Sequence, residues 1–212
     1  MKNRNNIRKL LIIALLATIS VVLMILEFPL PFAPSFYELD FSEIPVLIGA
    51  FAYGPLTGVV IEAVKILLNL MFTGSITMGV GELANFLIGI SLVVPASMIY
   101  YRHKTRKRAV IGLVVGTFAM VTMGAVLNAF VLLPAYAFFM STPEYTLTIA
   151  DFVAAGAAVN PLVTNLFSFI MFAVVPFNLF KGILVSAVVI LIYKRVSMLI
   201  KAKDSEDFEE II

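Results

Sequence analysis

Two polar side chains interrupt the last apolar run of this 212-residue sequence, Asn178 and Lys181 in Phe177-Asn178-Leu179-Phe180-Lys181-Gly182. A charge inside a membrane-spanning helix costs a few kcal/mol, so such residues usually face a polar cavity, a partner or a ligand. A spacing of three residues puts both side chains on one face of a helix. Because phenylalanines flank them, the pattern predicts one half of a small-molecule pocket.

A second polar group lies inside an earlier apolar run. Glu62 and Lys65 are three residues apart, and Asn69 follows four residues later. On a helix these side chains are neighbours, so Glu62 and Lys65 form either an internally neutralised structural pair or an ion-coupling site. The sequence leaves both interpretations open.

The composition indicates where these residues must sit. Hydrophobic residues make up 61% of the chain and charged residues only 13%, with a mean hydropathy of +1.05. This leaves too little polar surface for a soluble globule. The apolar runs have helical length, so we expect an all-α integral membrane protein whose backbone groups are satisfied within a helix bundle.

Proline, glycine and charge divide the chain into six predicted transmembrane helices. Prolines end the first helix and open a loop that reaches about residue 42, and Gly54-Pro55 separates the short second helix from the third. An apolar run after Pro161 is too short to span a bilayer, so we interpret 134–173 as an outer segment with a re-entrant or interfacial helix, although a seventh span stays possible. The predicted spans are 8–28, 43–53, 56–72, 79–101, 108–133 and 174–195.

The distribution of basic residues predicts the orientation. Thirteen of the fifteen Lys and Arg residues lie in three places, namely residues 2–9, 102–108 and 194–203. Six spans place all three on the cytoplasmic side together with both termini, whereas seven would not. We therefore expect a single six-helix membrane domain over 1–203 and a disordered, acidic cytoplasmic tail over 204–212.

This topology brings polar residues from four regions to one level near the outer face. Asn128 lies late in the fifth span, Glu82 and Asn85 begin the fourth, and Asp40 lies in the first loop. Together with Asn178 and Lys181, they predict a site for a neutral or weakly polar ring compound. Each region also carries an aromatic neighbour, and these are Phe41, Phe86, Phe130 and Phe177.

Two of these residues also have simpler interpretations. Asn128 on its own would suit a hydrogen bond between helices. The stem of Lys181 is long enough to reach the lipid headgroups, so its ammonium could instead lie at the membrane surface.

Small residues mark two predicted helix faces. Ala14 and Thr18 are four residues apart in the first helix, and Gly112, Gly116 and Gly124 share a face of the fifth. Such spacings allow close approach between helices or to another subunit.

Several functional classes are excluded by the sequence. There is no cysteine, and the single histidine, His103, lies in a basic loop, so thiolate metal sites, H-E-x-x-H zinc sites and serine–histidine triads are absent. A phosphate-binding G-x-x-x-x-G-K-[ST] motif is also missing, so the chain does not hydrolyse ATP itself. The basic loop is explained by membrane orientation and needs no nucleic acid. We expect a non-enzymatic membrane protein without a cofactor.

Six short stretches, in order along nearly the whole chain, resemble one known family. The sequence is similar to the substrate-binding S components of energy-coupling factor (ECF) vitamin transporters, and within them to the riboflavin-specific RibU branch. The stretches are Glu27-Phe28-Pro29-Leu30-Pro31, Asp40-Phe41-Ser42-Glu43-Ile44-Pro45, Gly54-Pro55, Thr73-Gly74-Ser75 through Asn85-Phe86, Leu132-Leu133-Pro134-Ala135-Tyr136, and Pro176-Phe177-Asn178 with Lys181.

The resemblance implies a riboflavin site near the outer face, capped by the first loop, in the plasma membrane of a prokaryote. Riboflavin would be the transported ligand, and a transmembrane T component with two ATPase subunits would supply the energy. The family pattern maps ligand hydrogen bonds onto Asn128, Asn178 and Lys181, with Glu82 and Asp40 as further candidates. It also maps a docking face for the T component onto Ala14 and Thr18.

Together, these considerations predict a subunit that captures riboflavin and depends on partners for transport, with Phe41 and Asn85 added to the site from their position. The alternative is a self-sufficient proton-coupled carrier that uses Glu62 and Lys65 as a relay.

Overall fold

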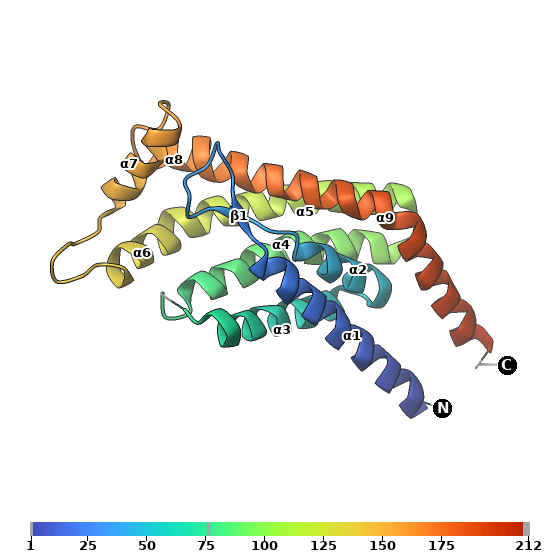
Figure 1. The fold of residues 1–212 in the computed structure, drawn as a ribbon. Coiled ribbons are helices and arrows are strands. Elements are labelled where there is room, and N and C mark those ends of the chain that lie inside the picture. Colours follow the sequence, from blue (N-terminus) through green and yellow to red (C-terminus); the bar gives the residue numbers. More distant parts are fainter. Residues whose placement is uncertain (1, 76, 210–212) are drawn as a thin grey trace.

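The computed structural model describes residues 2–75 and 77–209 and shows a bundle of helices with one small β-hairpin (Figure 1). The hairpin pairs β1 (Phe28–Pro29) with β2 (Glu38–Leu39) in antiparallel register. Two short π-helical segments, η1 (Asn128–Leu132) and η2 (Ile170–Val174), lie within longer helices. The α-helices are α1 (Lys2–Ile25), α2 (Glu43–Tyr53), α3 (Pro55–Thr73), α4 (Val80–Arg102), α5 (Arg106–Leu127), α6 (Leu133–Phe139), α7 (Ile149–Val159), α8 (Leu166–Phe169) and α9 (Val175–Glu209).

Four helical stretches are long and apolar enough to cross a membrane, which confirms the expected helical membrane fold. They are Pro55–Thr73, Val80–Arg102, Arg106–Phe139 and Leu166–Ile192. Lys9–Ile25, Glu43–Tyr53 and Ile149–Val159 are shorter apolar helices. Six spans and the orientation of the termini remain predictions.

Glycine and proline separate α2 from α3 as the sequence predicts. Gly54 has a φ of 98°, a conformation that side chains with a Cβ rarely adopt, and Pro55 occupies the first turn of α3. The chain therefore reverses here in a tight turn.

The prediction that the fifth helix ends at residue 133 is wrong, because helical structure continues from Arg106 to Phe139. A proline inside an α-helix clashes with the carbonyl group four residues earlier. Here η1 precedes Pro134, and the Leu133 amide donates to the carbonyl of Asn128, five residues back. The wider π turn leaves room for the ring, so the helix passes the proline unbroken.

The prediction that the last helix begins at residue 174 is also wrong, and this helix contains the second π turn. The run after Pro161 is neither re-entrant nor interfacial, because α8, η2 and α9 form one continuous helix from Leu166. Asn165 caps its N-terminus by accepting from the Ser168 amide at 2.9 Å. η2 lies just before Pro176, which has no N–H to donate to the Phe172 carbonyl four residues earlier. This carbonyl instead accepts from Asn160 Nδ2 at 3.5 Å.

The segment before this helix does contain a helix, α7, as expected. At the other end of the chain, α9 continues to Glu209, so residues 204–209 are helical and the prediction of a disordered tail is wrong for them. Residues 210–212 lie outside the described residues. The termini lie at the opposite side of the molecule from α7 and α8 (Figure 1).

The loop between α1 and α2 packs on α9. Its Ala33 and Leu39 form a small buried cluster with Phe177, and Tyr37 packs at the edge. The hairpin shapes this loop, and the apolar cluster holds it against the bundle (Figure 1).

Glycines of α5 bring two helices into backbone contact, as their spacing predicts. A Cβ atom at Gly112 would lie 2.4 Å from the Ala96 carbonyl oxygen, and one at Gly116 would lie 2.4 Å from that of Leu92. Both carbonyls belong to α4. At Gly124, the same atom would collide with the side-chain amide of Asn178 on α9.

We expect Gly116→Leu to separate α4 from α5 and to destabilise the fold by roughly 1–3 kcal/mol, because the clash involves backbone that cannot move aside. The measurement is the thermal unfolding midpoint in detergent. Val115→Leu, on the exposed side of the same helix, is the matched control. Equal midpoints for the two variants would contradict the packing role of Gly116.

Candidate functional site

A cavity of about 550 Å³ opens between the first loop and the ends of α3, α4, α6, α7 and α9. Ligand sites in proteins typically occupy 300–1,000 Å³. The lining residues come from segments that are far apart in the sequence. The polar ones are Glu27, Ser35, Tyr37, Glu38, Asp40, Glu43, Asn69, Thr73, Thr77, Glu82, Asn85, Asn128, Tyr136, Asn178 and Lys181.

The structure brings six of the seven residues predicted for substrate binding into this cavity: Asp40, Glu82, Asn85, Asn128, Asn178 and Lys181. Phe41 is not among the lining residues, and its ring lies 6.5 Å from that of Phe28. Of the other aromatic residues singled out, Phe177 lines the cavity, Phe86 does not, and Phe130 is 77% exposed. Of the residues singled out from the sequence, the polar ones therefore lie at this cavity more often than the aromatic ones.

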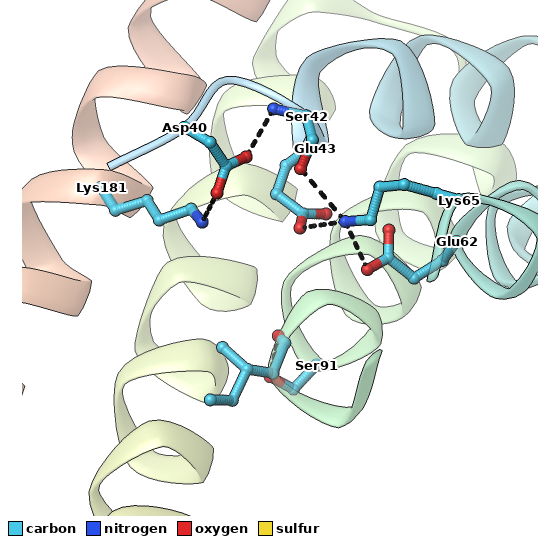
Figure 2. Close-up of polar contacts among 8 residues, drawn as sticks. Asp40, Ser42, Glu43, Glu62, Lys65, Ser91 and Lys181 are labelled. Carbon is cyan, nitrogen blue, oxygen red and sulfur yellow. Dashed lines mark hydrogen bonds and ion pairs between the residues drawn. The ribbon is translucent and has the colours of Figure 1, made fainter. Parts of the chain in front are cut away.

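Lys181 forms a buried ion pair with Asp40. The two are 9% and 2% exposed, and Lys181 Nζ lies 2.6 Å from Asp40 Oδ2 (Figure 2). The other carboxylate oxygen of Asp40 accepts from the Ser42 amide at 2.7 Å. Lys181 therefore points into the molecule, and the interpretation in which it reaches the headgroups is wrong.

The pKa values of two carboxyl groups in the first loop are shifted in opposite directions. Burial alone would raise the pKa of Asp40, but the ammonium groups of Lys181 and Lys65 lower that pKa to about 2. Partial burial, and then the negative charges of Glu38 and Asp40, raise the pKa of Glu27 to about 7. The contribution of the Asp40 pair to stability is therefore present above pH 3.8 and is lost as the pH falls through 2.

A second buried cluster lies beside the first. Lys65 Nζ lies 2.7 Å from Glu62 Oε1 and 2.9 Å from Glu43 Oε1, and it donates to Ser42 Oγ at 3.1 Å (Figure 2). The predicted Glu62–Lys65 pair is thus confirmed. The third charge, Glu43, was not anticipated, because nothing in its local sequence shows that α2 begins beside α3.

Asn128 binds the first loop rather than another helix. Its Oδ1 accepts from the Tyr37 hydroxyl at 2.5 Å, and its Nδ2 donates to the Gly124 carbonyl of its own helix. Burial raises the pKa of Tyr37 well above 10, so its hydroxyl stays protonated and can donate. The interpretation in which Asn128 forms a hydrogen bond between helices is therefore wrong. Tyr37 lines the cavity, and the sequence analysis missed it.

Asn178 keeps its acceptor available. Its Nδ2 donates to the Val174 carbonyl at 2.9 Å. Within the described part of the chain, the side chains of Asn69 and Asn85 make no hydrogen bond. These amide groups are positioned to pair with a ligand.

Aromatic rings form one wall of the cavity. Tyr37 lies 5.3 Å from Phe177, and Phe36 lies 5.7 Å from Phe152, measured between ring centroids. Tyr136 and Phe152 are 6.2 Å apart. Phe177 was singled out from the sequence, whereas Phe36, Tyr37 and Phe152 were not, because the first loop and α7 bring these three rings to the cavity. Aromatic surface opposite amides and carboxylates suits a flat ring with polar edges.

Side-chain hydroxyl groups accept hydrogen bonds from backbone amides at the start of α4. Ser75 Oγ accepts from the Gly79 amide and donates to Glu82 Oε2, each at 2.8 Å, while Thr77 Oγ1 accepts from the Gly81 amide at 3.1 Å. This helix start therefore binds its own loop.

The residues that the structure describes include no cluster of three or more side chains suited to holding a metal ion. The cavity instead offers hydrogen-bonding groups and aromatic surface, which is an arrangement for binding.

The predicted docking pair lies away from the cavity. Ala14 and Thr18 are exposed on α1, and the Thr18 hydroxyl donates to the Ala14 carbonyl at 2.8 Å. The pair lies among exposed apolar side chains, including Leu11, Leu15 and Ile19.

Comparison with known proteins gives a family and several relatives. The family model described as "ECF transporter, substrate-specific component" matches residues 8–193. The riboflavin transporter RibU of Staphylococcus aureus (strain TCH60) is 36% identical over 201 residues, which cover 94% of this chain and 95% of the relative. The riboflavin transporter FmnP of Bacillus subtilis (strain 168) is 32% identical over 188 residues, covering 88% and 90%.

A solved structure agrees with these matches. The S component of a bacterial ECF transporter superposes with a TM-score of 0.69 at 33% identity, covering 92% of this chain and 99% of that chain.

We expect Asp40→Asn to destabilise the protein by about 3–5 kcal/mol, because it leaves the buried Lys181 ammonium unpaired. The double variant Asp40→Asn/Lys181→Met removes both charges and should be more stable than Asp40→Asn alone. A double-mutant cycle of thermal midpoints measures the coupling, with Glu144→Gln, an exposed carboxylate outside the cavity, as the control. Additive effects would refute the pair.

Proposed function

Because the chain belongs to the family of substrate-specific components of ECF transporters, we propose that it captures riboflavin as the binding subunit of a vitamin uptake transporter. The family is a transporter component and not an enzyme. Relatives over nearly the whole length are named riboflavin transporters.

The observation that carries this proposal is the composition of the cavity beneath the first loop. Its amides come from four helical segments (α3, α4, η1 and α9), its aromatic wall from the first loop, α6, α7 and α9, and its volume is about 550 Å³. An isoalloxazine ring combines a flat apolar body with a polar imide edge, and its ribityl chain carries hydroxyl groups. The aromatic wall would hold the ring, while Asn85, Asn128 and Asn178 would bind its polar groups.

Lys181 and Asp40 would have two roles in this site. Their ion pair joins α9 to the first loop, so it helps to keep the loop over the cavity. The ammonium also lines the cavity and can donate to a ligand carbonyl.

The proposed membrane topology follows from the distribution of the Lys and Arg residues along the chain. A single domain over 1–203 crosses the plasma membrane six times with both termini in the cytoplasm, and the cavity opens outward. The helix Arg106–Phe139 supports this placement. At 34 residues, it is about 50 Å long and extends beyond a hydrocarbon layer of about 30 Å. Its end at the cavity would therefore reach the aqueous side.

Energy for transport would come from partners. The chain contains no phosphate-binding loop, so a T component and two ATPase subunits would drive release into the cytoplasm. The exposed face around Ala14 and Thr18 is the proposed contact with the T component, because small residues there allow close helix approach.

The purified protein is expected to bind riboflavin in a one-to-one ratio, followed by quenching of flavin fluorescence. Asn178→Ala should weaken binding by about 1–3 kcal/mol, because a ligand donor would lose its acceptor. Asn160→Ala, outside the cavity, is the matched control. Failure of the wild-type protein to bind riboflavin would refute the proposal.

Vesicles distinguish this function from a proton-coupled carrier. The protein alone should bind riboflavin without accumulating it, even across a proton gradient. Gradient-driven accumulation would favour the carrier, but Lys65 already binds both Glu62 and Glu43 in a buried cluster, which supports a structural role for Glu62 and Lys65.

We expect flavin mononucleotide to bind at least about tenfold more weakly than riboflavin, because its phosphate would face uncompensated negative charge. Five carboxylates line the cavity (Glu27, Glu38, Asp40, Glu43 and Glu82); lysines pair with Asp40 and Glu43, and the other three have no ion pair within the described residues. Competition titrations measure the ratio, which should shrink at high salt. Glu38→Gln should reduce it and Glu144→Gln should not, and equal affinities of the wild-type protein for the two flavins would contradict the expectation.

A further inference from the structure

One oxygen atom in the cavity wall has no partner. Glu43 is 1% exposed and lines the cavity, and its Oε2 makes no hydrogen bond within the described residues. Buried acceptors are nearly always paired, so an unpaired one is unusual and often marks a functional position. The carboxylate cannot turn away, because its Oε1 is held by Lys65 at 2.9 Å.

Within the described residues, no neighbouring group donates to this oxygen. Lys65 donates to Ser42 Oγ and to Glu43 Oε1, and its third short contact is with Glu62 Oε1. Lys181 donates to Asp40. The free acceptor of Glu43 therefore belongs to a side chain that lines the cavity, with nothing in the described chain to satisfy it.

Glu62 provides a natural comparison. It is as deeply buried, its Oε1 lies 2.7 Å from Lys65 Nζ, and neither of its carboxylate oxygens makes a hydrogen bond within the described residues. However, Glu62 does not line the cavity, whereas Glu43 does. The two glutamates lie on either side of the Lys65 ammonium (Figure 2), and they differ in that only Glu43 lines the cavity.

We propose that Glu43 is a ligand-binding residue whose Oε2 accepts a hydrogen bond from a hydroxyl or N–H group of the bound molecule, with Lys65 as the residue that positions it. The proposal rests on the function proposed above, since riboflavin carries both kinds of donor, in its ribityl chain and its imide. Binding would then satisfy an acceptor that no group of the described chain pairs.

Glu43→Gln and Glu62→Gln form the test, with riboflavin titrated onto the purified full-length protein. Both variants remove one carboxylate from the same lysine, so we expect similar shifts in thermal midpoint. Glu43→Gln should weaken riboflavin binding by about 10- to 100-fold, because a charged acceptor is replaced by an amide, and Glu62→Gln should change it less than about threefold. Unchanged affinity in Glu43→Gln, or equal losses in the two variants, would overturn the proposal.

Lumiflavin, which keeps the imide but lacks the ribityl hydroxyls, identifies the donor. Equal losses for riboflavin and lumiflavin in Glu43→Gln support the imide, and a loss for riboflavin alone supports a hydroxyl. If Glu43→Gln does not fold, Glu43→Asp carries the test, because it keeps the charge but withdraws the acceptor, and unchanged affinity there would overturn the proposal. Wild-type protein that binds no riboflavin would instead refute the proposed function.

Discussion

The need to neutralise two ammonium groups inside an apolar bundle determines much of this structure. Lys65 and Lys181 lie on different helices, and both find their carboxylates in one short stretch, Asp40 and Glu43 at the end of the first loop. An unpaired buried charge is strongly destabilising, so the loop cannot leave the bundle without leaving Lys181 unpaired, whereas Lys65 would keep Glu62 on its own helix. The same contacts that stabilise the interior therefore place the loop over the cavity, and folding and formation of the site are one event.

This arrangement also decides which polar groups are left for a ligand. Lys65 and Asp40 are fully used within the chain, and Asn128 is partly used by Tyr37. What remains available includes the amides of Asn69, Asn85 and Asn178 and the unpaired carboxylate oxygen of Glu43, opposite aromatic rings. Such a site selects for an uncharged ring with several donors and acceptors, and its negative rim disfavours anions. In the proposed function, specificity for the ligand would thus come from the polar groups of the cavity that make no hydrogen bond within the described chain.

Much of the site could be predicted from the sequence, because a charged or amide side chain in an apolar run is costly unless it serves a ligand or a partner group. Asn128, Asn178 and Lys181 were identified in this way, and the spacing of Glu62 and Lys65 predicted their contact. Prediction was poorer where the cause is tertiary. Phe130 carries no sign that its ring faces outward, and Glu43 becomes a site residue only through the packing of α2 on α3. Pro134 and Pro176 suggest helix ends, because sequence alone does not show that a π turn precedes each of them.

One of those π turns fixes the angular position of a side chain. An α-helix has about 3.6 residues per turn and a turn with i→i+5 bonding holds roughly one more, so the stretch from Asn128 to Tyr136 makes about two whole turns. Both side chains consequently face the cavity. Removing a single residue from the π turn would restore regular α-helical bonding, in which the remaining seven residues also make about two turns, so Tyr136 would keep its direction. The π turn thus absorbs one extra residue ahead of Pro134 without changing the direction of the side chains beyond it.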